Sequence, residues 1–161
     1  LVLMLDVAEH VEHDRDFVGD LVRCLMNPAA HLLFSVPAWP QLYGTHDAAL
    51  GHHRRYTPEA ARQLLHASGL RIVRGGGLFH SLVLPRYMEV ARERQRGGGL
   101  FPRPGITATP PKPEGLSWKR GRVLRGCAQM VLDADNALSR AAASAGADLP
   151  GLSWWALCQR A

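Results

Sequence analysis

The sequence predicts an α/β fold, on the basis of two apolar runs and the helical pattern between them. Residues 1–5 form a continuous apolar run, which is typical of a strand buried on both faces of a parallel sheet. A second apolar run, residues 31–36, ends at Pro37. Two strands joined by a helix form a βαβ unit, whose crossover is almost always right-handed.

The first helix is predicted from about Val11 onward. Acidic residues occupy its first turns, where they complement the helix dipole, and the pair Asn27-Pro28 ends it. Five apolar residues at helical spacing form its predicted buried stripe: Phe17, Val18, Leu21, Val22 and Leu25.

The next segment, residues 37–56, has little periodicity and is predicted to be a long loop that leaves the carboxyl end of the second strand. A second helix follows it, because Thr57 is a suitable N-cap and Pro58 suits the first helical position. Its buried face contains two leucines, and Gly69 ends it. Those leucines are Leu64 and Leu65.

The remaining chain contains two more predicted strands and two more predicted helices. Residues 70–73 form a strand, after which the three glycines of residues 75–77 are expected to loosen the chain. Residues from about Pro85 to 95 are predicted to be helical, and the Pro/Gly-rich residues 97–115 form a connector.

A long amphipathic helix is predicted from about Trp118 to Ala143, and residues 152–158 form the closing strand. The apolar stripe of that helix is Leu124, Cys127, Val131, Ala134, Leu138 and Ala141. The chain is therefore expected to contain a strand-and-helix part (1–78), a helical insert (79–146) and a terminal strand (150–161).

The charge is divided unevenly along the chain. Residues 1–50 contain two Arg and seven Asp or Glu, whereas residues 51–161 contain seventeen Lys or Arg and seven acidic residues. The first part has a net charge of −5 and the second a net charge of +10. The basic segment 86–125 suits an anionic substrate, an acidic membrane surface or nucleic acid, and a solvated Arg-rich face is the simpler alternative.

Three cysteines, Cys24, Cys127 and Cys158, lack the spacing of a zinc site or of a disulfide framework, so we expect them to be small buried residues. No apolar stretch approaches the roughly 18 to 20 residues that span a bilayer, and we expect a cytoplasmic protein. The apolar run at residue 1 has no initiator Met before it, so we expect further residues upstream.

Four segments, in this order, resemble the carboxyl-terminal half of class I S-adenosylmethionine-dependent methyltransferases, particularly the type 11 and type 12 group related to the quinone-biosynthesis enzymes. They are LDVAEHV (residues 5–11), LLFSVPA (32–38), HDxxLGHxRRYT (46–57) and LPGLSWW (149–155). Together they span nearly the whole chain. The third segment, with its fixed spacing, is the most specific.

The resemblance implies a Rossmann-like sheet of order 3-2-1-4-5-7-6 with strand 7 antiparallel, of which this chain supplies strands 4, 5, 7 and 6. A helical insert then separates the last two strands of the chain, and strand 4 is left as an open edge. The glycine-rich loop after strand 1 and the acidic residue that ends strand 2 are absent from the sequence. The resemblance therefore implies a missing amino-terminal half.

The same resemblance assigns candidate site residues. Asp6, Val7, Ala8 and His10 match the end of strand 4, which borders S-adenosylmethionine in the family. An oxygen nucleophile requires a base, and an unperturbed histidine suits that role. The candidate bases are His10, His46 and His52, each of which has a surface or capping position as its alternative.

The candidate acceptor-binding residues lie in the segment 37–56. Guanidinium groups and backbone donors before a helix N-terminus suit a carboxylate or phosphate, while aromatic residues suit the walls of a pocket. Pairing of Arg54 or Arg55 with Asp47 is the alternative for the arginines, and a core position is the alternative for the aromatic residues. The candidates are Trp39, Tyr43, Arg54, Arg55 and Tyr56.

Asp6, Glu9 and His10 have the D/E-x-x-E-H spacing with which ubiquinone-type O-methyltransferases hold a divalent metal. The alternative is a network at the entry of the first helix, in which Glu9 and His10 bond to the backbone.

The resemblance implies transfer of a methyl group to a small molecule. The insert combines apolar faces with many arginines, a composition that suits a lipid-like or anionic acceptor at a membrane surface. These arginines are Arg86, Arg92, Arg94, Arg96, Arg120, Arg122 and Arg125. The alternative function is a non-catalytic module that docks through this insert on a membrane or a partner protein. Nucleic acid is disfavoured, since the chain has neither a recognition-helix signature nor an RNA-binding aromatic motif.

Overall fold

The computed structural model describes residues 1–95 and 122–161, which form a mixed α/β fold around a four-stranded sheet. The strand order is β1-β2-β4-β3. The strands are β1 (Val2–Leu5), β2 (His31–Pro37), β3 (Leu70–Leu78) and β4 (Ser153–Arg160). The helices are α1 (Asp14–Leu25), α2 (Thr45–Ala49), α3 (Pro58–Ala67), α4 (Val83–Gln95) and α5 (Arg122–Ser144). Short 3-10 turns occur at η1 (Ala8–His10), η2 (Pro40–Leu42) and η3 (His80–Leu82). The predicted α/β class is confirmed.

The predicted βαβ unit is present as β1, α1 and β2. β1 pairs in parallel with β2, so that Met4 lies opposite Phe34, and both side chains are buried. α1 packs against the same face of the sheet through Val18 and Val22. The predicted stripe on α1 was too wide, because Leu25 is 68% exposed.

Helix α3 begins and ends as predicted. The Thr57 hydroxyl accepts a hydrogen bond from the backbone N–H of Ala60 at 3.1 Å, and Pro58 occupies the first turn. Gly69 follows the helix with φ of +78°, a conformation that favours glycine. Leu65 is fully buried, and Leu64 nearly so.

The expectation that the three glycines loosen the chain after a short strand was wrong. β3 runs through Gly75, Gly76 and Gly77 to Leu78 and pairs antiparallel with β4, with Gly77 opposite Trp154. A Cβ atom on Gly77 would overlap the backbone oxygen of Leu149, so glycine permits the close approach of the preceding loop to this strand.

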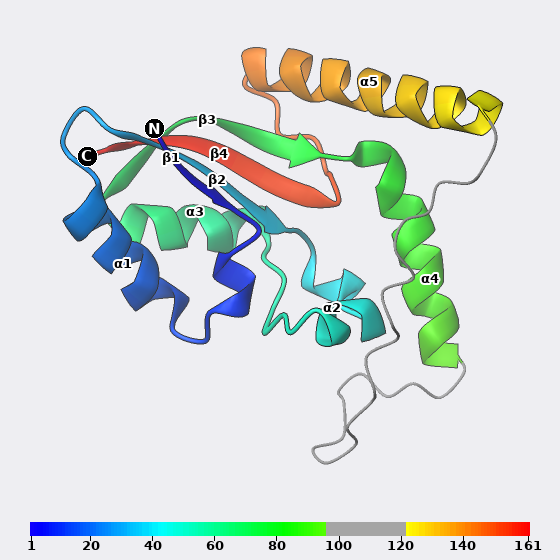
Figure 1. Ribbon diagram of the computed structural model, residues 1–161, viewed down its shortest axis with the longest axis horizontal. Helices are drawn as coiled ribbons and strands as arrows, with labels where there is room; N and C mark the ends of the chain where they lie inside the picture. The colour runs from blue at the N-terminus through cyan, green and yellow to red at the C-terminus, as the bar shows by residue number, and fades with distance from the viewer. Residues whose placement is uncertain (96–121) are drawn as a thin grey trace.

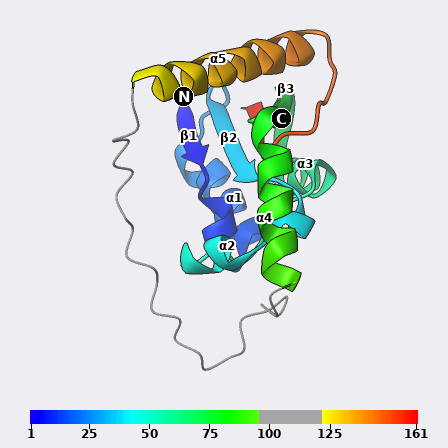
Figure 2. The same ribbon diagram turned by 90° about the vertical axis from the view of Figure 1, so that its right-hand side faces the viewer.

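The main core lies between one face of the sheet and the helices α1 and α3, which are both below the sheet in Figure 1. Trp154 is its largest fully buried side chain. Helix α5 lies on the opposite face, where it contacts β3 and η3, and Figure 2 shows the same separation from a second direction.

Strand β1 is an edge strand, and only one of its faces is covered. Leu3 is 59% exposed and Leu5 is 48% exposed, although the apolar run predicted burial on both faces. Among the described helices, α5 covers that side of the sheet mainly at β3, which is the other edge strand.

The face of helix α5 that packs against the rest of the chain is not the face that was predicted. Cys127, Val131 and Leu138 of the predicted buried stripe are exposed, whereas the polar residues Asp135 and Ser139 are buried. Asp135 accepts hydrogen bonds from the backbone and the hydroxyl of Ser81, and Ser139 contacts His80 at 3.0 Å. Polar contacts with η3 thus decide which face of the helix is covered.

Several predicted features lie outside the described residues. They are the 97–115 connector, Arg96, Arg120, the predicted helix start at Trp118, and the side chains of Arg122, Leu124 and Arg125. Among the described helices, none combines the length and the apolar character needed to cross a membrane.

Candidate functional site

The candidate site lies at the carboxyl ends of β1 and β2. The chain turns sharply there, because Asp6 has φ of +52° and donates its backbone N–H to the Ser35 carbonyl at 3.0 Å. The Ser35 hydroxyl donates in turn to Asp6 Oδ1 at 3.0 Å. This pairing joins the ends of the two parallel strands and directs the chain into η1, which carries Ala8, Glu9 and His10.

The structure brings Glu9 and His10 together with His52, which comes from the loop after α2. One ligand atom from each of the three side chains lies within 4.8 Å of the other two. The His10 and His52 rings meet edge to face, with centroids 4.6 Å apart.

Glu9 is completely buried, yet neither of its carboxylate oxygens has a hydrogen-bond partner among the described residues. Burial raises the pKa of this carboxyl from 4.5 to about 7, since the charged form loses its hydration. The backbone of Glu9, by contrast, is satisfied, because its carbonyl accepts the His53 N–H at 2.7 Å.

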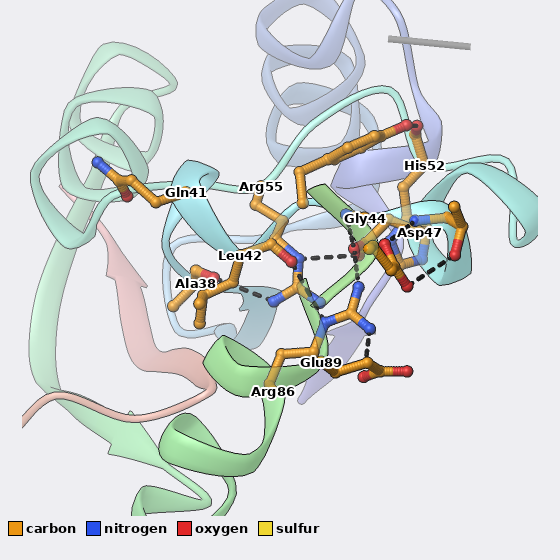
Figure 3. Close-up of polar contacts among 12 residues, drawn as sticks. Ala38, Gln41, Leu42, Gly44, Asp47, His52, Arg55, Arg86 and Glu89 are labelled. Carbon is orange, nitrogen blue, oxygen red and sulfur yellow. Dashed lines mark hydrogen bonds and ion pairs between the residues drawn. The ribbon is translucent and has the colours of Figure 1, made fainter. Parts of the chain in front are cut away.

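Asp47 is the centre of a buried polar network, shown in Figure 3. Its carboxylate accepts from the Gly44 N–H at 3.0 Å, from Arg55 Nε at 2.8 Å and from Arg86 Nη2 at 2.7 Å. His52 Nδ1 lies 3.0 Å from Asp47 Oδ1. Burial alone would raise the pKa of this carboxyl, but Arg55 and the hydrogen bonds outweigh burial and lower it below 3.8.

The two arginines of this network have further acceptors. Arg55 Nη1 donates to the Ala38 carbonyl at 3.1 Å, and Arg86 Nε donates to the Leu42 carbonyl at 3.2 Å. Figure 3 shows both guanidinium groups directed at the Asp47 carboxylate. Arg86 was predicted as part of a basic surface, which is wrong, because it is buried against Asp47.

Arg54 and Tyr56 do not contact Asp47 but the start of α1. The Tyr56 hydroxyl donates to Asp14 Oδ2 at 2.7 Å, and Arg54 Nη1 lies 3.2 Å from the same oxygen. Burial raises the pKa of Tyr56, and the Asp14 carboxylate raises it further. These contacts attach the loop before α3 to α1.

Of the five candidate acceptor residues, Arg55 and Trp39 each line a different cleft, and the other three line neither of these clefts. A cleft of about 360 Å³ is lined by His46, His52, Arg55 and Arg86, among others. A second, mostly apolar cleft of about 400 Å³ is lined in part by Trp39, whose indole N–H donates to the Gly151 carbonyl at 2.8 Å. The Tyr43 hydroxyl donates a hydrogen bond to the His52 carbonyl at 2.7 Å.

The structure brings together only two of the three predicted metal ligands. Glu9 and His10 converge, but Asp6 is not part of the cluster, and its carboxylate accepts a hydrogen bond from the Ser35 hydroxyl. His52 is the third member of the cluster, and the sequence did not predict it as a ligand. Arg86 was also missed as a partner of Asp47, because the two residues are 39 positions apart in the sequence.

No family model matches this sequence, and no curated protein matches it either.

Proposed function

We propose that this chain is the carboxyl-terminal part of an S-adenosylmethionine-dependent methyltransferase that acts on a small-molecule acceptor. The observation that carries the proposal is the sheet order β1-β2-β4-β3, in which β1 and β2 are parallel and β4 is antiparallel to both of its neighbours. Strands 4, 5, 7 and 6 of a class I methyltransferase sheet have this order and these directions.

The exposed edge of β1 supports the proposal. In a sheet of that class, strand 1 pairs with strand 4, and β1 holds the corresponding place at the edge. Leu3 and Leu5 are exposed on this strand, so a further layer would cover apolar side chains. An upstream part of the protein would supply that strand together with the glycine-rich loop.

The end of β1 fits the adenine side of the cofactor. Val7 and His10 are exposed beside the turn at Asp6, while Ala8 is buried in the core. Asp6, Val7, Ala8 and His10 would therefore border the cofactor. When bound, S-adenosylmethionine supplies an activated methyl group with a neutral leaving group.

The remaining task of the protein is to hold the nucleophilic atom of the acceptor in line with the methyl–sulfur bond of the cofactor and to remove the proton from that atom. Positioning alone supplies a large part of such a rate enhancement. His52 is the preferred base among His10, His46 and His52, because Asp47 fixes its ring and burial lowers its pKa. The cleft lined by Arg55, Arg86, Asp47 and Glu89 is next to it and suits a small polar acceptor, because the charges of the arginines are balanced by the two carboxylates.

The test is calorimetric titration of S-adenosylhomocysteine into this chain and into a version extended upstream through the gene. We expect saturable binding by the extended version. The His10→Ala variant should lose this binding, whereas the His31→Ala variant, changed at the opposite end of β2, should keep it. Absence of binding by both versions would overturn the proposal. Salt-sensitive binding to anionic vesicles would then favour the non-catalytic module.

A further inference from the structure

We propose that the outer face of helix α5 binds the same face of a second copy of this chain, so that the two helices form an antiparallel pair with two-fold symmetry. The inference does not rest on the proposed methyl transfer. Helix α5 packs against β3 and η3 through the side on which Asp135 and Ser139 are buried. Away from that side, Met130 is 72% exposed, and Val131 and Leu138 are exposed as well. Three large apolar side chains on one helix are therefore open to solvent, and such a patch is typical of an interaction surface.

The outer face of α5 has the heptad repeat of a coiled coil. Its residues recur at steps of three and four over about five helical turns, and all of them are exposed. The buried Asp135 and Ser139 occupy positions b and f of the same heptads, on the opposite side of the helix. Among the described elements, α5 is the outermost on its side of the sheet, so this seam is free to meet another helix (Figure 1). The seam residues, at positions a and d in turn, are Cys127, Met130, Ala134, Ala137, Ala141 and Ser144.

The sizes of the seam residues fit an antiparallel pair, in which each a position faces a d position of the other helix. A two-fold register that places Ala134 opposite Ala137 of the second copy also places Met130 opposite Ala141 of the second copy. Each of these layers then combines two small residues, or one large and one small residue. The two helices can therefore approach closely while the methionines fill the space at either end.

The residues beside the seam fit the same register. On one flank, Asp133 faces Arg140 of the second copy, and the two-fold symmetry forms this pair twice. On the other flank, Val131 and Leu138 meet in the same way. Gln129 donates to Asp133 Oδ1 at 2.9 Å within its own helix, which leaves Oδ2 for the arginine.

The flanking charges decide the orientation of the pair. A parallel pair would place Asp133 beside Leu138 of the second copy, whereas the antiparallel pair gives each carboxylate a guanidinium partner. Exposed ion pairs add little affinity, but they select the partner and its direction. An interface of one helix per copy is at or below the lower limit of about 1,200 Å² for stable complexes, so we expect a reversible dimer.

The test is sedimentation velocity of the full chain over a range of concentrations. We expect the mass of one chain in dilute solution and of two chains at high concentration. Arg140→Asp places two carboxylates opposite each other and should weaken dimerisation at least about 10-fold, as should Asp133→Arg, which opposes two guanidinium groups. The double variant with both substitutions exchanges the charges and should restore the dimer. A chain that remains monomeric at about 1 mM, or a double variant that is no better than the single ones, overturns the proposal.

A matched pair of substitutions tests the seam itself. Met130→Lys places a charge in the seam and should prevent dimerisation, whereas Asn136→Lys adds the same charge at an exposed position outside it and should not. Association that is unchanged in Met130→Lys would place the contact elsewhere, for example at the β1 edge, and would overturn the proposal. The version extended upstream through the gene should also dimerise. If it stays monomeric, the upstream part covers the seam and the proposal is wrong. Circular dichroism of each variant shows that a loss of association is not a loss of folding.

Oxidation at high concentration tests the orientation, in a Cys24→Ser background that leaves Cys127 as the exposed thiol. The antiparallel pair places the two copies of Cys127 about 25 Å apart, so no disulfide should join the two chains. Adding Ser144→Cys should allow a disulfide between Cys127 and position 144 of the second copy. A disulfide between the two copies of Cys127 would show a parallel pair and contradict the proposed register.

Discussion

Asp47 and Arg86 form a buried ion pair that joins α2 to α4, with Arg86 Nη2 only 2.7 Å from Asp47 Oδ2. The Asp47 side chain has no solvent exposure, and that of Arg86 is 6% exposed. Arg55 pairs with the other oxygen of the same carboxylate at 2.8 Å. One buried anion therefore balances two buried cations and holds three separate segments together.

Replacement of this anion should be strongly destabilising. Asp47→Asn leaves the buried Arg55 guanidinium without its carboxylate partner and Arg86 with only the exposed Glu89. We therefore expect a loss of about 3–5 kcal/mol in the free energy of unfolding. Urea denaturation measures the loss. The matched control is Asp20→Asn, which removes an exposed pair with Arg23 and should cost no more than about 1 kcal/mol. Equal effects of the two substitutions would contradict the importance of the network.

The same carboxyl should titrate at unusually low pH. Its pKa in the folded chain is below the usual 3.8, so its stabilising contribution is complete above that value and is lost as the pH falls through the folded pKa. An NMR titration of the Asp47 side chain measures this directly. An Asp47 midpoint above the usual 3.8 would show that burial outweighs the arginines.

Features with local causes were predicted well from the sequence. Helix α3 depends on contacts within a few residues of Thr57 and Gly69, and both ends were found. The βαβ unit was found because β1 and β2 are short apolar runs separated by a helical period.

Features that depend on distant parts of the chain were missed. Arg86 is 39 residues from Asp47, so nothing near either residue showed that they pair. The glycines that precede Leu78 form a strand only because β4 lies beside them. The cluster of Glu9, His10 and His52 likewise requires the fold to place a loop after α2 against η1. The sequence predicted the residue types of the site and offered the pairing of Arg55 with Asp47 as one alternative, but it did not predict that Arg86 and His52 meet the same carboxylate.

Neutralising Glu9 should stabilise the metal-free chain at alkaline pH. A buried carboxylate without a partner is costly, so Glu9→Gln in the presence of a chelator should raise the free energy of unfolding at pH 8 by about 1–3 kcal/mol. Because the pKa of Glu9 is raised from 4.5 to about 7, this cost is complete only above about pH 7 and disappears below 4.5.

The matched control for this stabilisation is Glu12→Gln, which changes an exposed carboxylate and should have little effect at any pH. Urea denaturation at pH 8 and at pH 5 measures both variants. A loss of stability in Glu9→Gln at pH 8 would mean that the carboxylate has a stabilising partner.

The glycines of β3 should tolerate no side chain at the point where the loop approaches. Gly77→Ala places a Cβ atom against the Leu149 oxygen and should destabilise the chain by at least about 1–3 kcal/mol, because backbone must move. Gly126→Ala in α5 is the control. Its Cβ meets nothing within 4 Å, and alanine should stabilise the helix by about 0.5–1 kcal/mol. Thermal unfolding distinguishes the two variants. A Gly77→Ala variant as stable as the parent chain would contradict the close approach of the Leu149 backbone to β3.

The three cysteines should react at very different rates, although the sequence predicted all three to be buried. Cys24 and Cys127 are exposed, whereas Cys158 is fully buried in the core, where burial raises its thiol pKa to about 12. Since the thiolate is the nucleophile, an aromatic disulfide reagent should modify two thiols rapidly and the third only after unfolding in urea. The Cys24→Ser and Cys127→Ser variants assign the two fast reactions. Rapid reaction of Cys158 in the folded chain would contradict the burial of this β4 side chain in the core, and protection of Cys127 in dilute solution would contradict the exposed face of α5.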